Sequence, residues 1–143
     1  MLNNMNTRTL VTPLRAVLLT IALGAAGAFA TAAFAEDGND FVDKKYSISG
    51  DWYLVEEEGR TIIRFSDSFK TKGGPDLKVF LSPTSIDDAS GKNATSGSVL
   101  LGALQSTSGG QDYVLPEGIN LSDFSSVLVH CEQFSVLWGG GAL

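Results

Sequence analysis

The chain has 143 residues, a formal net charge of −6 and a single cysteine. Its length accommodates one domain with a leader or a tail. The single cysteine excludes an internal disulfide and a dithiol redox cycle within one chain. The acidic balance, with no basic cluster along the sequence, is unfavourable for binding nucleic-acid phosphates or anionic membrane surfaces, so we expect no nucleic-acid partner.

The N-terminal stretch has the pattern of a secretory signal peptide. Arg8 and Arg15 precede an uncharged run over residues 16–35, which ends in the small-x-small motif AFA at 33–35. A basic start, an apolar middle and such an end are typical of a cleaved export signal. We therefore predict a signal peptide over residues 1–35, cleavage after Ala35, and a periplasmic or secreted protein without stable membrane insertion.

Two alternatives stay open for this segment. The 20 uncharged residues are about the length that a transmembrane helix needs, although the second half is rich in Ala and Gly rather than Leu. A second small-x-small motif at 28–30 would place cleavage before Thr31, but the abrupt change of composition at Glu36 favours the first site. Cleavage after Ala35 would leave eight basic residues against all sixteen acidic ones, a net charge of −8.

The residues that follow predict a polar tether and then a β-hairpin. Residues 36–46 are polar and charged, which is typical of a linker. From residue 47 onward, apolar residues alternate over 48–54, a charged turn EEEG follows at 56–59, and a second alternating run covers 61–65. Two such runs about a short turn that contains glycine predict a hairpin.

Short strands separated by turns are predicted along the rest of the chain. A polar loop is expected over 84–97 and a turn or helical corner over 119–126, and no segment has a helical apolar stripe. The expected strands lie within 77–82, 98–105, 111–116, 127–131 and 134–139. This pattern predicts an all-β, antiparallel sandwich or barrel-like single domain over residues 47–143.

His130 and Cys131, the only histidine and the only cysteine, stand side by side in one of these strands. Neighbouring side chains of a strand point to opposite faces, so Cys131 shares a face with Val127 and Val129 and His130 shares one with Leu128. Metal sites need several ligands that converge on one point. We therefore predict neither a metal site nor a cysteine nucleophile activated by His130.

The residues around Cys131 favour a structural role for this side chain. Free cysteine is among the most buried residue types, and it packs as a small hydrophobe. Apolar neighbours and the adjacent anion Glu132 both disfavour a reactive thiolate. The alternative, a thiol that a partner can reach in an oxidising compartment, stays open at this point.

The order of segments resembles the DM13 domain family. The matching pieces are GPDLKVFLSP at 74–83, LGALQSTSGGQDYVLP at 101–116 and the terminal pattern V-x-C-x-x-F-x-V-x-x-G at 129–139. With the hairpin segment, they cover nearly all of residues 47–141. This chain has His130 where the family usually has an aromatic or aliphatic residue before the cysteine.

The resemblance implies a β-sandwich-like domain with an electron-transfer role centred on the cysteine, here Cys131. It also implies a redox partner protein or a membrane cytochrome, and it identifies no cofactor. The leading hypothesis is an exported accessory redox domain with Cys131 as the redox-active residue. The alternative is an extracytoplasmic binding or surface-interaction module in which Cys131 belongs to the core.

Overall fold

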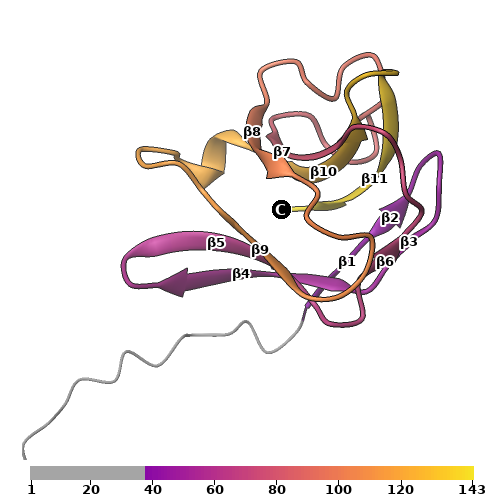
Figure 1. The fold of residues 1–143 in the computed structure, drawn as a ribbon. Helices are drawn as coiled ribbons and strands as arrows, with labels where there is room; N and C mark the ends of the chain where they lie inside the picture. The colour runs from indigo at the N-terminus through magenta and orange to yellow at the C-terminus, as the bar shows by residue number, and fades with distance from the viewer. Residues whose placement is uncertain (1–37) are drawn as a thin grey trace, which may run out of the picture.

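The computed structural model describes residues 38–143, which form two main antiparallel sheets with a core of buried side chains between them (Figure 1). The predicted all-β, antiparallel single domain is confirmed. The signal peptide predicted over 1–35 lies outside the described residues. Within residues 38–143, no helix has the length and apolar character needed to cross a membrane.

The first sheet is built around the predicted hairpin. Its strand order is β1-β4-β5-β9, and the strands are β1 (Asn39–Asp40), β4 (Asp51–Glu57), β5 (Arg60–Phe65) and β9 (Gln111–Val114). The β4–β5 turn consists of Glu58 and Gly59, whose φ angles are 50° and 73°. A two-residue type I′ turn requires positive φ at both positions. Glu58 and Gly59 meet this requirement, so the chain reverses there between β4 and β5.

The second sheet holds the C-terminal hairpin at its centre. Its order is β2-β11-β10-β7-β8, and the strands are β2 (Val42–Asp43), β11 (Val136–Ala142), β10 (Ser126–Cys131), β7 (Leu77–Ser82) and β8 (Val99–Ala103). A small third sheet pairs β3 (Ile48–Ser49) with β6 (Lys70–Thr71). The predicted turn or helical corner contains one short 3₁₀ helix, η1 (Leu121–Asp123).

The stretch interpreted as a tether, 36–46, contributes to both sheets. Within it, β1 pairs with β4 and β2 pairs with β11, so regular structure begins before residue 47. All four strand residues are exposed. These strands are held through main-chain pairing and through Phe41 between them, whose ring packs on Phe65 and Phe69 of the inner core.

Two clusters of buried side chains lie on opposite faces of the second sheet. We call the larger one, between the two sheets, the inner core; it includes Trp52, Ile63, Phe65, Leu77, Val79, Val127, Val129, Cys131 and Trp138. The smaller one, the outer core, consists of Phe80, Ile86, Ala89, Ala94, Leu128 and Leu137. The loop predicted over 84–97 supplies three of these residues, so it covers the sheet rather than projecting into solvent.

Strand β11 packs closely because it contains three successive glycines. A Cβ atom added to Gly140 would lie 2.4 Å from the carbonyl oxygen of Val127, and one added to Gly141 would lie 2.2 Å from Nε1 of Trp52. Trp52 is a β4 residue with 1% of its surface exposed. Glycine at 141 therefore permits close contact between the first sheet and β11.

We predict that Gly141→Ala destabilises the domain by about 1–3 kcal/mol, because the new methyl group must displace the buried Trp52 ring. Gly73→Ala is the matched control, since its added Cβ would meet only Thr107 Cγ2 at 3.8 Å. Urea unfolding followed by tryptophan fluorescence measures both. Equal stability of the two variants would show that β11 can move away from Trp52 at no cost.

Candidate functional site

Cys131 is the last residue of β10 and lies in the inner core. It is paired with Leu77 of β7 on one side and with Val136 of β11 on the other. Its thiol is free, and 0% of the residue surface is exposed. The sulfur therefore has no contact with solvent in this structure.

His130 lies on the opposite face of the same strand, as the alternation predicts. Its ring meets the edge of the Phe80 ring, with centroids 6.1 Å apart, and Phe80 belongs to the outer core. Only 2% of His130 is exposed, and its Nδ1 atom has no hydrogen-bond partner. The sheet separates this imidazole from the Cys131 thiol, so the two do not form an acid–base pair.

Burial lowers the pKa of His130, and the nearby carboxylate of Glu132 opposes this effect only in part. A charged imidazolium would be unfavourable in the outer core because it would lose its hydration. His130 is therefore a neutral core residue at neutral pH.

Trp138 lies in the inner core, beside a bulge in β11. Val129 pairs with Gly139 and His130 pairs with Leu137, so Trp138 is the extra residue between them. The bulge shifts the register of β11 against β10 after Leu137. Trp138 packs with the inner core, whereas its neighbour Leu137 packs with the outer core.

Trp138 also connects the inner core to the surface. Its indole N–H donates a hydrogen bond to the carbonyl oxygen of Lys72 at 2.8 Å, and its ring packs on Tyr46 with centroids 4.2 Å apart. The ammonium group of Lys72 lies 4.9 Å from the centre of the Tyr46 ring. The Trp138–Tyr46 pair therefore extends from the inner core, which contains Cys131, to the half-buried Tyr46 ring beneath the ammonium group of Lys72.

An ion cluster closes the end of β10 beside Cys131. Lys78 forms ion pairs with Glu132 and with Asp76, the latter at 3.4 Å. The Glu132 N–H also donates to the carbonyl oxygen of Asp76 at 3.1 Å. The hydrogen bond with Glu132 raises the pKa of Lys78. We call these three residues the strap, because they tie the residue after Cys131 to the loop before β7.

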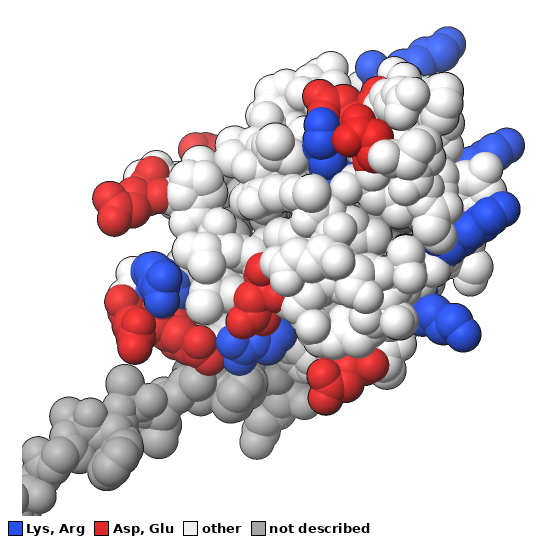
Figure 2. All heavy atoms as spheres, viewed as in Figure 1, with Lys and Arg blue, Asp and Glu red and all other residues white. Residues whose placement is uncertain are grey.

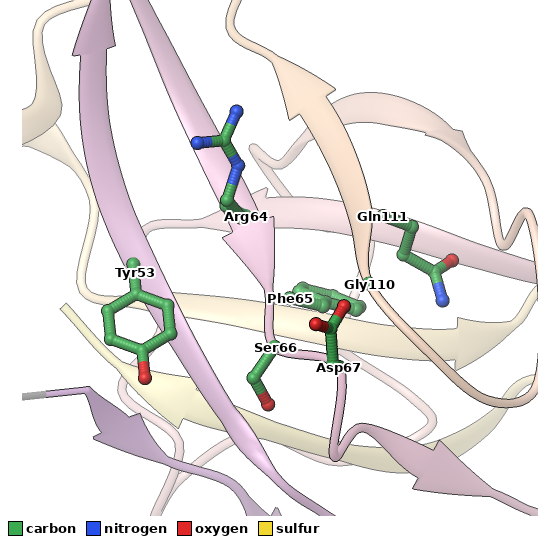
Figure 3. Close-up of a pocket in the computed structure, with 7 residues that line it drawn as sticks. All are labelled: Tyr53, Arg64, Phe65, Ser66, Asp67, Gly110 and Gln111. Carbon is green, nitrogen blue, oxygen red and sulfur yellow. The ribbon is translucent and has the colours of Figure 1, made fainter. Parts of the chain in front are cut away.

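The hollow drawn in Figure 3 lies away from Cys131, on the first sheet. It has a volume of about 310 Å³ and is lined by Tyr53, Arg64, Phe65, Ser66, Asp67, Gly110 and Gln111. The guanidinium of Arg64 is already bonded to Asp112 at 2.7 Å and to Glu57 at 2.9 Å, and these bonds raise its pKa. Arg64 is thus already paired with two carboxylates, and the lining of this hollow contains no thiol or imidazole.

No group of three or more His, Cys, Asp or Glu side chains gathers as a metal site within residues 38–143. The predicted site residue Cys131 lies among the apolar side chains of the inner core, to which Trp138 also belongs. Sequence reasoning did not identify Tyr46, Lys72 and Trp138 as neighbours of one another. Their separation along the chain leaves no local signal for this contact.

We predict that His130→Leu reduces the loss of stability on acidification. The folded state lowers the pKa of His130, whereas in the unfolded chain the pKa is about 6.5. The wild type therefore loses stability as the pH falls below about 6.5, because the unfolded state then binds the extra proton. Urea unfolding at pH 8 and pH 5 measures this, and identical pH dependence of both proteins would contradict it.

The family model described as "Electron transfer DM13" matches residues 40–142. The match runs from the end of β1 through the last residue of β11, and so it includes the strap, Cys131 and Trp138. No curated protein and no solved structure matches the chain.

Proposed function

The chain belongs to the DM13 family, and from that premise we propose that it is an exported accessory domain in electron transfer with Cys131 as its redox-active residue. The observation that carries the proposal is the family match over residues 40–142, whose description is electron transfer. Cys131 supports it further, because it is the one cysteine in the chain and lies in the terminal Val-x-Cys-x-x-Phe pattern.

The chemistry that we propose is exchange with a disulfide of a partner protein. The thiol of Cys131 loses its proton to water, and the thiolate attacks one sulfur of the partner disulfide. A new S–S bond forms to Cys131, the partner S–S bond breaks, and the second partner sulfur leaves as a thiolate. Two electrons thereby pass from the Cys131 thiolate to the partner sulfur that leaves.

Burial of the sulfur sets a condition on this chemistry. Because 0% of Cys131 is exposed, a partner sulfur reaches it only after part of the fold opens. Cys131 ends β10, and the turn over 132–135 follows, with 63% of Phe134 exposed. Segments near such ends open more easily than a whole domain unfolds. We propose that the strap and this turn form the segment that opens.

We predict that the native protein reacts with an aromatic disulfide reagent through local opening. The rate, measured in increasing urea below the unfolding transition, should give an opening free energy below that of global unfolding. It should also depend only weakly on urea, because a local opening exposes little surface. Equal free energy and equal urea dependence for labelling and for global unfolding would exclude direct thiol chemistry in the folded domain.

A matched pair of variants tests the strap. Lys78→Met removes the ion pairs with Asp76 and Glu132 and should speed the reaction of Cys131. Arg60→Met removes an ion pair with Glu58 at the far β4–β5 turn and should leave the rate unchanged. An equal effect of both variants would mean that labelling reports overall stability and not the strap.

One observation favours a second function, an extracytoplasmic binding module in which Cys131 is core. The cysteine lies fully buried among apolar side chains, with the only imidazole on the other face of the sheet. This function predicts that the reagent labels Cys131 only through global unfolding. The same urea series therefore distinguishes the two functions.

Export is the remaining part of the proposal. We propose that residues 1–35 direct secretion and are then removed, on the basis of Arg8, Arg15, the apolar run and the AFA motif. Intact mass of the protein recovered from the periplasm or medium should correspond to a chain that starts at Glu36. A full-length chain recovered with the membrane fraction would support the transmembrane anchor instead.

A further inference from the structure

Lysines from three separate parts of the sequence lie around β11 and the segments beside it. We call this surface the lysine face; it consists of Lys44, Lys45, Lys70, Lys72 and Lys92. Figure 2 shows basic side chains projecting along the right edge of the molecule, whereas acidic ones lie over the left, upper and lower parts of the view. That edge is therefore locally basic despite the net negative charge of the chain.

Strand β11 holds most of this face together. The N–H groups of Lys44 and Lys45 donate to the carbonyl oxygens of Trp138 and Leu137 at 3.1 and 3.2 Å. The carbonyl of Lys72 accepts the Trp138 indole N–H. Lys70 lies two residues before Lys72, in β6, and is paired with β3. Lys92 follows Gly91, and Gly91 lines a hollow together with Lys44 and Lys45.

The lysines of the lysine face form no ion pair within residues 38–143. The ion pairs found in that part of the chain use Arg60, Arg64 and Lys78. The Lys44 ammonium donates to a carbonyl oxygen, that of Asp87, at 3.2 Å. Unpaired charges on one side of an acidic protein steer an oppositely charged surface toward that side.

The face also offers apolar contact surface. A hollow of about 470 Å³ lies between Lys44 and Lys45 and the apolar side chains of Ala89, Val136 and Leu137. Phe134, the most exposed of the large apolar side chains, precedes Ser135 at the wall of this hollow. Half-buried Tyr46 lies beneath Lys72. Aromatic and apolar contacts within a charged rim are typical of protein interfaces.

We propose that the lysine face docks an acidic surface of a redox partner protein, with an apolar side chain of the partner seated in the hollow between Lys45 and Val136. This rests on the proposed function, because it names the partner surface for the same redox domain. Docking here places the partner over Tyr46 and Trp138, and Trp138 packs in the inner core with Cys131.

A protein partner fits the charge distribution better than an anionic membrane does. The exported chain would carry a net charge of −8, so an extended anionic surface would repel most of the domain. By contrast, an acidic patch of limited area on a partner protein would contact the lysine face alone. The hollow adds a contact that an apolar protein side chain can fill.

Two acidic peptides test the proposal by NMR titration of the ¹⁵N-labelled exported chain. Both are rich in glutamate; one has a central phenylalanine and the other an alanine at that place. We expect shifts at residues 44–46, 70–72 and 90–92 for both, weaker binding at higher salt, and tighter binding with additional shifts at Val136 and Leu137 for the phenylalanine peptide.

Charge reversal identifies the surface. The triple variant Lys44→Glu, Lys45→Glu, Lys72→Glu should bind the phenylalanine peptide at least about tenfold more weakly. Arg60→Glu, at the far hairpin, should bind as the wild type does. Unchanged binding by the triple variant, or no binding by the wild type, overturns the proposal. Binding to phosphatidylglycerol vesicles without binding to either peptide overturns it in favour of a membrane surface.

The result of the peptide-binding test can be distinguished from the result of the Cys131 labelling test. The reaction of Cys131 with the small disulfide reagent needs no docked protein, so the triple variant should react at the wild-type rate. Lost peptide binding with unchanged labelling means that the two properties are independent. Absent peptide binding in a wild type that still labels through local opening rejects the docking surface alone.

Discussion

Burial of strand β10 on both faces is the constraint on which the rest of the structure depends. All six of its residues are buried, and the strand pairs with β7 on one side and β11 on the other. One face requires the first sheet as a cover and the other requires the loop that carries Ile86, Ala89 and Ala94. This arrangement separates Cys131 from His130, because successive side chains enter different cores.

The position of Cys131 within that strand determines which chemistry the fold permits. The sulfur is deep in an apolar core, but Cys131 is the last residue of β10, and the Asp76–Lys78–Glu132 strap closes this end of the strand. A buried thiol with no base beside it is unreactive while the fold is closed. Under the proposed function, electron transfer through this residue requires local opening and a partner that approaches the strap and Trp138.

Prediction from the sequence succeeded where structure depends on local alternation. The β4–β5 hairpin, the strand that contains Cys131 and the opposite directions of His130 and Cys131 all follow from a period of two residues. The predicted loop over 84–97 is a loop, but its sequence did not reveal that Ile86, Ala89 and Ala94 are buried against the sheet. Strands β1 and β2 were not predicted either, because their exposed side chains leave no alternation in the sequence.

By itself, the sequence determined the all-β class, the alternate faces of each strand and the family pattern around Cys131. Only the tertiary structure decided that Cys131 is fully buried, because burial depends on side chains from β7 and β11 and from the opposing sheet. It also decided that lysines from residues 44–45, 70–72 and 92 border one side, around Tyr46 and Trp138. The physical reason is that strand pairing and main-chain hydrogen bonds unite positions whose separation along the chain leaves no common local pattern.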